Sequence, residues 1–481
     1  MARALALVAL LVLSGWQSQA QAAGKPNVLM IAVDDLNHWV GYLGRNNQTQ
    51  TPNLDALAAR GVSFTHAYCA APVCNPSRTA LMSGMRPSST GVYNNGQDFR
   101  PHVPREITLN ATFKKAGYNL YGCGKIYHGS YDRKDEWDDY LKPSGDPKPK
   151  PGQNDGVGGI KFAPLDCKDE DLEDYKIADY AIDHLNQKHD KPFFISCGFH
   201  KPHMPWNVPQ KYYDKFPLEP IQLPPYQKDD LNDVPSGGIQ MAKPNGDHKQ
   251  IVESGRWKDA IQGYLAAINY LDMNVGRVIA ALDKSAYKDN TIVVLWGDHG
   301  WHLGEKDHWR KFALWEEATR MPYIWVVPGM TKAGGVCHSP VDLMSVYPTL
   351  CELASIEKPA HLEGLSIKTL LANPAAEWKN VAVTTHGYKN HAVRSDRWRY
   401  IRYEDGGEEL YDHSKDEFEW TNLANDPALA KVKAELQKAL PKTDHPDVKG
   451  GGEAAAAATT ETKKERNQRR KAAAAAAEKK D

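Results

Sequence analysis

The sequence has almost no net charge, with 59 Lys and Arg against 60 Asp and Glu among its 481 residues. A chain so nearly neutral has no overall field that would draw it to nucleic acid or to an anionic membrane surface. An anionic ligand must therefore be held by local charge. After its first residues the sequence also lacks any apolar run long enough to cross a bilayer as a helix. These absences argue against a nucleic-acid-binding or membrane-spanning protein and leave a globular one.

The only marked apolar run lies at the start of the chain. Arg3 precedes a short apolar stretch over residues 4–13, and Ala20-Gln21-Ala22 has the small-x-small pattern of a cleavage site. The run is too short to span a bilayer as a helix. The pattern predicts a signal peptide over residues 1–22 and an exported protein, secreted or periplasmic. A retained N-terminal anchor is the alternative.

Cysteine is scarce, with seven residues at positions 69, 74, 123, 167, 197, 337 and 351. An odd number in an exported protein leaves at least one cysteine unpaired. If Cys74 is chemically modified, the remaining six permit disulfides without requiring them. Cys123 and Cys197 lie in apolar, strand-like runs and could equally be reduced core residues.

The stretch from Cys74 to Arg78, Cys-Asn-Pro-Ser-Arg, has the pattern of a helix start. Pro76 suits the first helical position, where its missing N–H costs nothing, and Gly84 suits the end. A thiol at the start of a helix has a lowered pKa and is reactive. Arg78, one turn further on, can pair with an oxyanion. A buried free cysteine beside an ordinary helix cap is the alternative.

Four apolar runs with the character of buried parallel strands end at Val33, Gly122, Cys197 and Trp296. Helical patterns separate them, which predicts a doubly wound α/β sheet. Ligands of such sheets bind at the carboxyl ends of the strands. The polar residues found there are Asp34 and Asp35, then Lys125 and His128, then His203, then Asp298 and His299, with Lys311 a little further on.

Each of these groups of polar residues could also have a purely structural explanation. Two adjacent carboxylates such as Asp34 and Asp35 repel each other unless a cation lies between them. A solvated loop or a helix cap is also a common place for such a pair. Lys125 and His128 can point into one cleft, or they can be a surface lysine and a packed histidine. The common position of all four groups favours a functional site.

The remaining parts of the chain divide by composition. Two long excursions, 130–173 and 205–254, show little periodicity and are expected to be surface loops that set specificity together with 93–100. The alternation over 391–403 predicts one antiparallel strand. We therefore predict a catalytic domain over 23–375, a small C-terminal α+β subdomain over 376–441, and a low-complexity, disordered tail over 442–481.

Taken in order, the acidic pair, Cys-x-Pro-Ser-Arg, Gly-Lys-x-x-His, Lys-Pro-His and Asp-His-Gly resemble the type I, formylglycine-dependent sulfatases across about residues 25–425. The pattern is most similar to the iduronate-2-sulfatase-like branch, in which the last metal ligand is a histidine, as at His299. The resemblance implies an alkaline-phosphatase-like fold: a doubly wound, mostly parallel sheet with a smaller C-terminal α+β domain.

The resemblance also implies cofactors. Cys74 would be oxidised to formylglycine by a formylglycine-generating or sulfatase-maturating enzyme. Asp34, Asp35, Asp298 and His299, with the modified Cys74, would bind one divalent ion, Ca²⁺ rather than Mg²⁺. Carboxylate oxygens suit Ca²⁺.

In the mechanism that the resemblance implies, one hydroxyl of the hydrated formylglycine attacks sulfur and the second later expels sulfate. Arg78 and His128 would hold and deprotonate the hydrate, and Lys125 and Lys311 would grip the sulfate. His203 would protonate the leaving alcohol, with His128 as the alternative acid. The three cationic side chains offset the three aspartates, so the charge of the metal remains to attract the substrate.

Three functions remain open at this point. The first is an exported sulfatase acting on a sulfated sugar, either a glycosaminoglycan 2-O-sulfate or an algal or mucin glycan, with an undetermined oligomeric state. The second is a phosphate or phosphonate ester hydrolase of the same fold, against which the intact Cys-x-Pro-Ser-Arg argues. The third is a non-catalytic protein that binds sulfated glycans without the modified cysteine.

Overall fold

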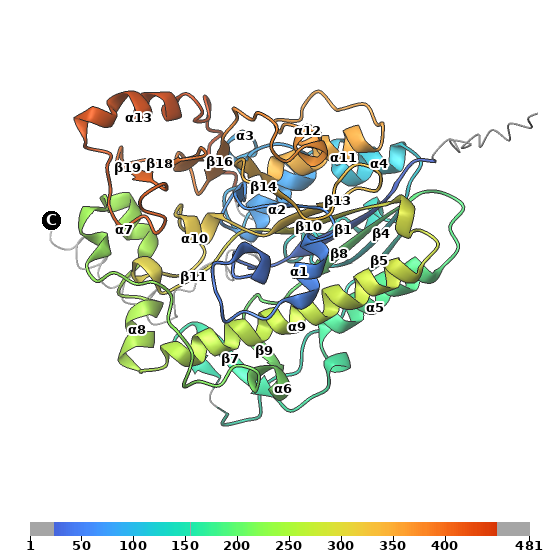
Figure 1. The fold of residues 1–481 in the computed structure, drawn as a ribbon, viewed down its shortest axis with the longest axis horizontal. Helices are drawn as coiled ribbons and strands as arrows, with labels where there is room; N and C mark the ends of the chain where they lie inside the picture. Colours follow the sequence, from blue (N-terminus) through green and yellow to red (C-terminus); the bar gives the residue numbers. More distant parts are fainter. Residues whose placement is uncertain (1–23, 154, 450–481) are drawn as a thin grey trace, which may run out of the picture.

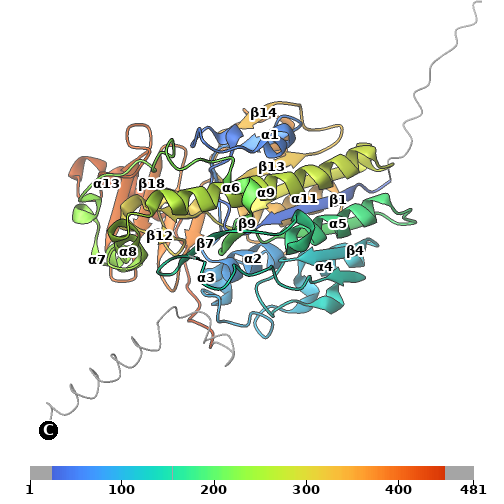
Figure 2. The same cartoon turned by 90° about the horizontal axis from the view of Figure 1, so that it is seen from below.

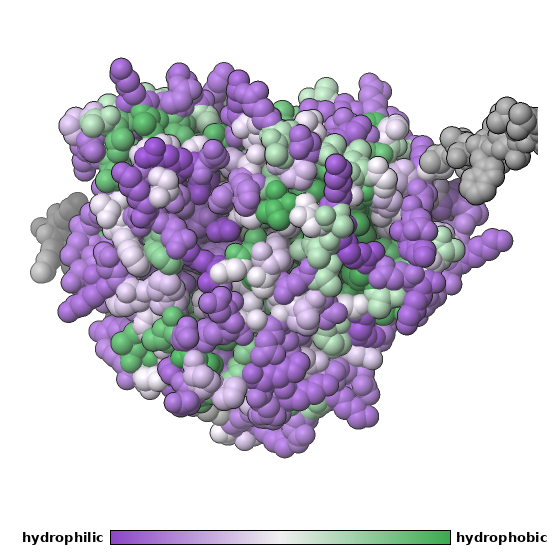
Figure 3. Space-filling model, in the orientation of Figure 1, coloured by the Kyte–Doolittle hydropathy of each residue, from purple (hydrophilic) through white to green (hydrophobic). Residues whose placement is uncertain are grey.

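The structure is a computed structural model, and it describes residues 24–153 and 155–449. The predicted signal peptide and residues 450–481 of the predicted tail lie outside the described residues. Within the described part of the chain, no helix is both long and apolar enough to cross a membrane. The face of the molecule in Figure 3 is mostly hydrophilic, with apolar residues in several small groups.

An eight-stranded sheet forms the centre of the molecule (Figure 1). Its strands, in order across the sheet, are β14 (Gly335–Cys337), β2 (Val62–Phe64), β13 (Tyr323–Val326), β10 (Thr291–Gly297), β1 (Asn27–Val33), β8 (Phe193–Phe199), β4 (Asn119–Gly124) and β5 (Asp139–Leu141). The run from β10 to β5 is parallel throughout, and β13 is antiparallel to both of its neighbours. The mostly parallel α/β sheet is thereby confirmed, and the four predicted strands are direct neighbours in it.

Both faces of this sheet are covered by helices. In Figure 1, α5 (Glu173–Asn186) and α9 (Trp257–Lys284) lie below the sheet, and four helices lie above it: α2 (Cys74–Ser83), α4 (Leu109–Lys115), α11 (Val346–Leu353) and α12 (Lys368–Ala372). Figure 2 shows the same arrangement from below, with α9 crossing in front of the strands. Along β1, Leu29 and Ile31 face one core and Val28 and Met30 the other. A strand buried on both faces must be apolar at every position, which explains its continuous hydrophobic run.

Local sequence accounts for the ends of several helices. Pro52 begins α1 (Pro52–Ala58), and the hydroxyl of Thr108 accepts from the Ala111 amide at 3.2 Å to cap α4. α2 begins at Cys74, two residues before Pro76, which was expected in the first helical position, and it is closed by Gly84, which has a left-handed φ of 72°. A Cβ there would lie 2.1 Å from the Leu362 side chain, so only glycine fits.

The two excursions are more ordered than predicted. The first contains β6 (Gly156–Val157) and β7 (Ile160–Leu165), and the second contains β9 (Trp206–Pro209) and the helices α6 (Gln210–Tyr213), α7 (Ser236–Ala242) and α8 (Asp247–Glu253). β7 and β9 pair in parallel, although they lie far apart in the sequence. The loop prediction was wrong because such short elements are stabilised by packing across the fold rather than by their own periodicity.

The apolar stretch over residues 341–353 begins as a strand and only later becomes a helix. Val341 and Asp342 form a short strand, β15 (Val341–Asp342), which pairs with β3 (Ala67–Tyr68). The Asp342 side chain then accepts from the Met344 amide, and the α-helix starts only at Val346.

The C-terminal part is a four-stranded antiparallel sheet, seen at the upper left of Figure 1 with α13 (Ala430–Gln437) beside it. Its strands are β16 (Ala382–Thr385), β17 (His391–Arg394), β18 (Trp398–Arg402) and β19 (Glu408–Asp412). The single strand expected over 391–403 is in fact a hairpin, closed by the Ser395 amide bonding to the Trp398 carbonyl at 2.9 Å. The remaining short elements are α3 (Pro87–Thr90), α10 (Glu316–Thr319), β11 (His302–Leu303) and β12 (Trp309–Arg310).

All seven cysteines are free thiols. Cys123 and Cys197 lie opposite each other on β4 and β8 and are fully buried, so they are reduced core residues.

Candidate active site

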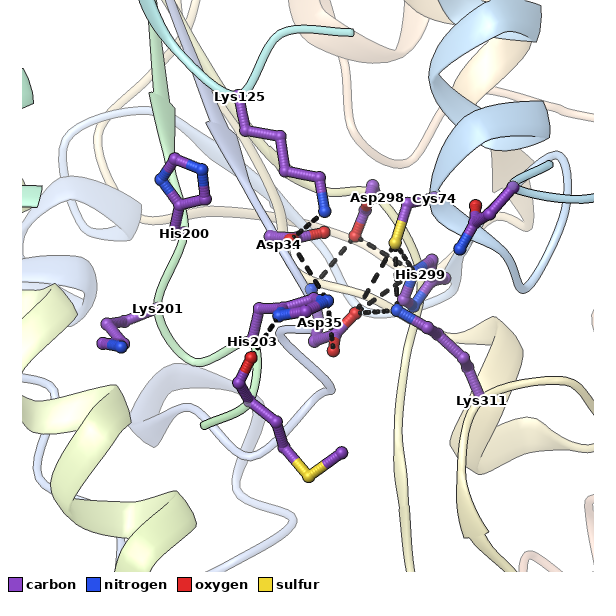
Figure 4. A network of polar contacts seen from close by, with 12 residues as sticks. Asp34, Asp35, Cys74, Lys125, His200, Lys201, His203, Asp298, His299 and Lys311 are labelled. Carbon is purple, nitrogen blue, oxygen red and sulfur yellow. Dashed lines mark hydrogen bonds and ion pairs between the residues drawn. The ribbon is translucent and has the colours of Figure 1, made fainter. Parts of the chain in front are cut away.

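The polar groups predicted at the strand ends do converge at one edge of the sheet (Figure 4). Asp34 and Asp35 follow β1, Lys125 follows β4, His203 lies beyond β8, and Asp298 and His299 follow β10. Cys74 joins them from the start of α2, and Lys311 comes from the segment after β12. The alternative of an ordinary capped cysteine is thereby rejected, because Cys74 lies within this cluster.

Backbone geometry directs the acidic pair into the site. The Asp34 amide donates to the Phe199 carbonyl at 3.2 Å, which continues the β1–β8 pairing by one residue. Asp35 then adopts a left-handed φ of 57°, a conformation that a non-glycine residue rarely takes. Its amide donates to Asp298 Oδ1 at 3.1 Å, and its carbonyl accepts from the Tyr264 hydroxyl at 2.8 Å. Strain at Asp35 is thus balanced by contacts on two other elements.

The Cys74 thiol has three polar neighbours. Lys311 Nζ lies 2.9 Å from Sγ, His299 Nε2 lies 3.4 Å away, and Asp35 Oδ1 lies 3.9 Å away. Burial and the nearby Asp34 carboxylate raise the pKa of the Cys74 thiol, but the ammonium groups of Lys125 and Lys311 outweigh them and leave it below its usual value. The site therefore favours negative charge at the position of this sulfur.

Arg78 holds several parts of the site together. Its Nε donates to Asp298 Oδ2 at 2.8 Å, its NH2 lies 3.4 Å from Asp34 Oδ1, and its NH1 donates to the Lys125 carbonyl. Burial alone would lower the pKa of Arg78, but Asp298 and Asp34 raise it, so the fully buried guanidinium stays charged. Arg78 thus orients the ends of β1, β4 and β10 towards one another.

Each of the two lysines pairs with one carboxylate of the acidic pair. Lys125 Nζ bonds to Asp34 Oδ2, and Lys311 Nζ lies 2.6 Å from Asp35 Oδ1. Burial opposes the charged form of Lys311, but Asp35 and the other negative groups raise its pKa above the usual value. Both ammonium groups are therefore charged at neutral pH and face the cluster.

The histidines are held in defined tautomers by backbone carbonyls. His203 Nδ1 donates to the Met204 carbonyl at 2.6 Å, so Nε2 is the atom that faces the two aspartates, 3.9 Å from Asp34 Oδ2 and 3.8 Å from Asp35 Oδ2. His299 Nδ1 donates to the Gly300 carbonyl at 2.9 Å, which turns Nε2 towards the thiol.

Burial, and then Lys125, lower the pKa of His128 to about 3, and its Nδ1 has no hydrogen-bond partner.

The donor set fits a divalent cation. Two overlapping groups, Asp34 with Asp35, Cys74 and His203, and Asp34 with Cys74, Asp298 and His299, each bring their ligand atoms within 4.8 Å of one another. Asp35 Oδ2 is buried without a hydrogen-bond partner, as expected of an atom that awaits a cation. Burial, together with the charges of Asp34 and Cys74, raises the pKa of Asp35 to about 7. A cation would relieve this repulsion, and all five predicted ligands lie within the two groups.

A third group of possible ligands does not fit a metal. Glu316, His413 and Glu419 also lie close together. The Arg399 guanidinium bonds to both glutamates, so their charge is already compensated. We therefore assign this group a structural role between α10 and the C-terminal sheet.

A cavity of about 800 Å³ opens onto the site. Asp35, His203 and Lys311 lie on its wall, and the outer wall carries further cations: Lys148, Lys150, Lys161 and Arg310. The first excursion supplies three of these lysines, and the segment expected to set specificity supplies Asn94 and Asn95. A cavity of this charge suits an anionic ligand larger than sulfate alone.

Several residues that shape the site were not predicted from the sequence. Tyr264 sits within the apolar stripe of α9, where a tyrosine gives no sign of its bond to Asp35. Asp174 accepts from the amides of His200 and Lys201, at 2.7 and 2.8 Å, and so fixes the turn before His203. Lys201 itself binds Asp146 and points away from the cluster in Figure 4.

Comparison with known proteins agrees with this geometry. Residues 26–356 match the sulfatase family model, and residues 298–445 match the model of the C-terminal part of N-sulphoglucosamine sulphohydrolase. The chain is 40% identical to a sulfatase of Formosa agariphila over 451 residues, covering 87% of each protein. It is 30% identical to human iduronate 2-sulfatase over 411 residues, covering 74% of each. It is also 30% identical to a Delta 4,5-hexuronate-2-O-sulfatase of Bacteroides thetaiotaomicron over 456 residues, covering 88% of this chain and 89% of that protein.

Two solved structures bear on the fold. A 2-O GAG sulfatase superposes with a TM-score of 0.67 at 28% identity, covering 86% of this chain and 90% of that one. A phosphonate monoester hydrolase of Agrobacterium radiobacter superposes with a TM-score of 0.71 at 20% identity, covering 86% of this chain and 94% of that one. At that identity the second match shows the shared fold alone.

Proposed function

The chain belongs to the sulfatase family and is a sulfuric ester hydrolase, and from this premise we propose that it removes sulfate from a sulfated sugar by means of a formylglycine made from Cys74 and one Ca²⁺ ion. The observation that carries the proposal is the position of Cys74 Sγ, which lies 2.9 Å from Lys311 Nζ and beside the acidic groups at the sheet edge. A formylglycine-generating or sulfatase-maturating enzyme would install the modification.

We propose a sulfated hexuronate, carrying its sulfate on the 2-oxygen, as the sugar. Relatives named for iduronate 2-sulfate and for hexuronate 2-O-sulfate support this assignment. Lys148 on the wall of the cavity suits a carboxylate next to the sulfate. The leader pattern over residues 1–22 supports an enzyme that works outside the cytoplasm.

Two groups would supply chemistry here: formylglycine at the position of Cys74 would provide a hydroxyl nucleophile, and Ca²⁺ held by Asp34, Asp35, Asp298 and His299 would offset charge on the sulfate. Everything else is done by the side chains of this chain.

Lys125 and Lys311 bind and orient the sulfate oxygens. Each is now paired with one carboxylate of the acidic pair, so the two ammonium groups lie on either side of the place where the sulfur must sit. Fixed, buried positive charge of this kind stabilises a transition state because it needs no reorganisation. Arg78 holds Asp34 and Asp298 in place through the bonds described above.

His203 moves a proton at its Nε2 atom. Its Nδ1 proton is engaged with the Met204 carbonyl, so only Nε2 is free to protonate the leaving alcohol. Burial, with Lys125 and Lys311 nearby, holds the pKa of His203 well below its usual value, although Asp34 opposes this. The negative charge of a bound sulfate ester acts in the opposite direction on this pKa. We assign the acceptance of a proton from the nucleophile to His128, whose imidazole is neutral in these surroundings.

Kinetics on paired esters tests the proposal. We expect turnover of 4-nitrophenyl sulfate and of a 2-O-sulfated unsaturated uronyl disaccharide, and little turnover of 4-nitrophenyl phosphate. Cys74→Ala should abolish sulfate release while leaving the fold intact. Faster hydrolysis of the phosphate or of a phosphonate monoester than of the sulfate would move the assignment to the second candidate, a phosphate or phosphonate ester hydrolase of the same fold.

A further inference from the structure

Residues 93–97 form a short loop that contacts the first turn of α2, which carries Cys74, on one side and residues 447 and 448 on the other. Asn94 and Asn95 line the cavity. The loop also holds Asn75, the second residue of α2: the Asn75 amide donates to Asn95 Oδ1 at 2.9 Å, and Asn75 Nδ2 donates to the carbonyls of Asn94 and Gln97 at 3.0 and 2.7 Å. The first turn of the helix that carries Cys74 is therefore fixed by this loop.

The side chain of Gln97 is the centre of the loop. It is 2% exposed, and its amide makes four hydrogen bonds. Oε1 accepts from the amides of Tyr93 and Asn94 at 2.6 and 2.8 Å. Nε2 donates to Asp447 Oδ1 and to the Val448 carbonyl at 2.8 and 2.7 Å. Because backbone N–H groups face Oε1 and oxygen acceptors face Nε2, the side-chain amide of Gln97 satisfies its hydrogen bonds in only one of its two flipped orientations.

Asp447 and Val448 belong to a segment that was expected to be part of a disordered tail. Residues 444–448, which we name the C-terminal strap, instead pack on the catalytic domain. The His445 amide donates to the Ser88 carbonyl at 2.6 Å, and the Val448 amide donates to the Gly91 carbonyl at 3.1 Å.

Two further contacts fix the ends of the strap. The Tyr93 hydroxyl donates to the His445 carbonyl at 2.7 Å, and Asp444 lies 3.1 Å from His391 Nε2 on β17. Gly91 lies so close to the strap that a Cβ there would sit 2.5 Å from the Pro446 carbonyl oxygen. The strap thus follows a built path across the surface, from the C-terminal sheet to the loop.

We propose that Gln97 is a positioning residue for sulfate ester hydrolysis, through which the C-terminal strap holds Asn94 and Asn95 on the cavity wall and fixes the first turn of α2 beneath Cys74. The inference rests on the proposed role of Cys74. Gln97 is buried and all the hydrogen bonds of its side-chain amide are made, so any shift of the strap relative to the loop would leave a donor or acceptor unpaired. The amide therefore keeps the loop and the strap in a fixed relative position. Misplacement of a reacting group by about 1 Å can cost on the order of 100-fold in rate.

The variant Gln97→Glu tests this with almost no change in size. Its carboxylate still accepts from Tyr93 and Asn94, but it places negative charge against Asp447 and the Val448 carbonyl and pushes the strap away. We expect kcat/KM on the 2-O-sulfated disaccharide to fall about 10- to 100-fold. The double variant Gln97→Glu with Asp447→Asn restores one donor opposite one acceptor and should recover most of the loss.

The matched control is Gln262→Glu on α9, where Nε2 donates to the Phe216 carbonyl at 2.8 Å away from the cavity. A purely structural role for Gln97 would lower Tm in Gln97→Glu without changing kcat/KM at temperatures where the variant is folded. Equal kinetics in Gln97→Glu and wild type, or a double variant no better than the single one, would overturn the proposal.

Hydrogen–deuterium exchange of the peptides that contain residues 88–97 gives a readout that needs no turnover. We expect faster exchange there in Gln97→Glu and a return to the wild-type rate in the double variant. Unchanged exchange would overturn the coupling. A wild-type protein that turned over neither sulfate ester would instead contradict the proposed function, and the exchange rates would still support or overturn the link between strap and loop.

Discussion

Lys311 has the most direct contact with the reacting position of any side chain in the site. It lies 2.9 Å from Cys74 Sγ and 2.6 Å from Asp35 Oδ1, and it is almost completely buried. Its neighbours Arg310 and Phe312 both have left-handed φ angles, 79° and 74°. His308 Nε2 lies 2.6 Å from its carbonyl oxygen. The backbone on either side of Lys311 thus has φ angles that non-glycine residues rarely adopt, and this conformation directs the Lys311 ammonium group into the site.

Lys311→Met should therefore lower kcat by about 100- to 1000-fold, as expected when one preorganised donor to a developing charge is removed. Steady-state kinetics on 4-nitrophenyl sulfate measures the loss. Lys211→Met is the control, because Lys211 is an exposed lysine that pairs with Asp169 at 2.6 Å far from the cluster. Comparable rates for the two variants would contradict the role assigned to Lys311.

Asp35 should make metal-free stability depend on pH. The pKa of Asp35 in the folded state, about 7, lies above the ordinary value of an aspartate, so the folded state binds a proton that the unfolded state has already lost. The stability that this proton binding contributes to the folded state is therefore present at low pH and is lost as pH rises towards about 7. In EDTA, the Tm of Asp35→Asn minus that of wild type should grow from about pH 4 to about pH 7 and then level off.

Added Ca²⁺ should reverse that order, because wild type binds the ion more tightly than Asp35→Asn does and ligand binding stabilises the folded state. Thermal melts across the pH range with and without Ca²⁺ provide both measurements. A Tm difference that does not change with pH, or Ca²⁺ that stabilises both proteins equally, would contradict the placement of Asp35 in the metal site.

At the scale of elements, strand β18 joins the C-terminal sheet to the catalytic domain through Arg399. The guanidinium is buried and bonds to Glu316 of α10 and to Glu419. Burial lowers the pKa of Arg399, but the two glutamates raise it above its usual value. Removal of this one cation would deprive both buried carboxylates of a directly bonded charge partner.

We expect Arg399→Met to lower the free energy of unfolding by about 3–5 kcal/mol. Arg397→Met is the matched control on the same hairpin, because the Arg397 side chain is 49% exposed and its pair with Asp412 is open to water. Urea unfolding measures both. Similar losses in the two variants would show that the buried network does not join the sheet to α10.

The elements also show what could be predicted from sequence. The strands that end at Val33 and Trp296 were visible because burial on both faces demands continuous apolar residues, and the polar residues after them then had to meet at one edge. β7 and β9 were missed because each is stabilised by the other, across more than forty positions of chain. The turn at Ser395 was missed because a short hairpin keeps the alternation of one long strand.

At the scale of the whole molecule, the site is assembled by contacts that leave no local trace. Gln97 reaches Val448 across 351 positions, and Tyr264 reaches Asp35 across 229. Neither side chain belongs to a motif, so only the fold reveals what it holds. The motif residues themselves could be predicted because their chemistry, paired carboxylates and a cysteine at a helix start, is unusual at any position.

The central claim is that Cys74 is the precursor of the catalytic group. Peptide mass spectrometry of protein purified from its own host, across the peptide that contains Cys74, tests it most directly. We predict a loss of mass that corresponds to replacement of the side-chain CH₂SH by an aldehyde, in step with sulfatase activity. An active preparation in which Cys74 is an unmodified thiol throughout would contradict the account.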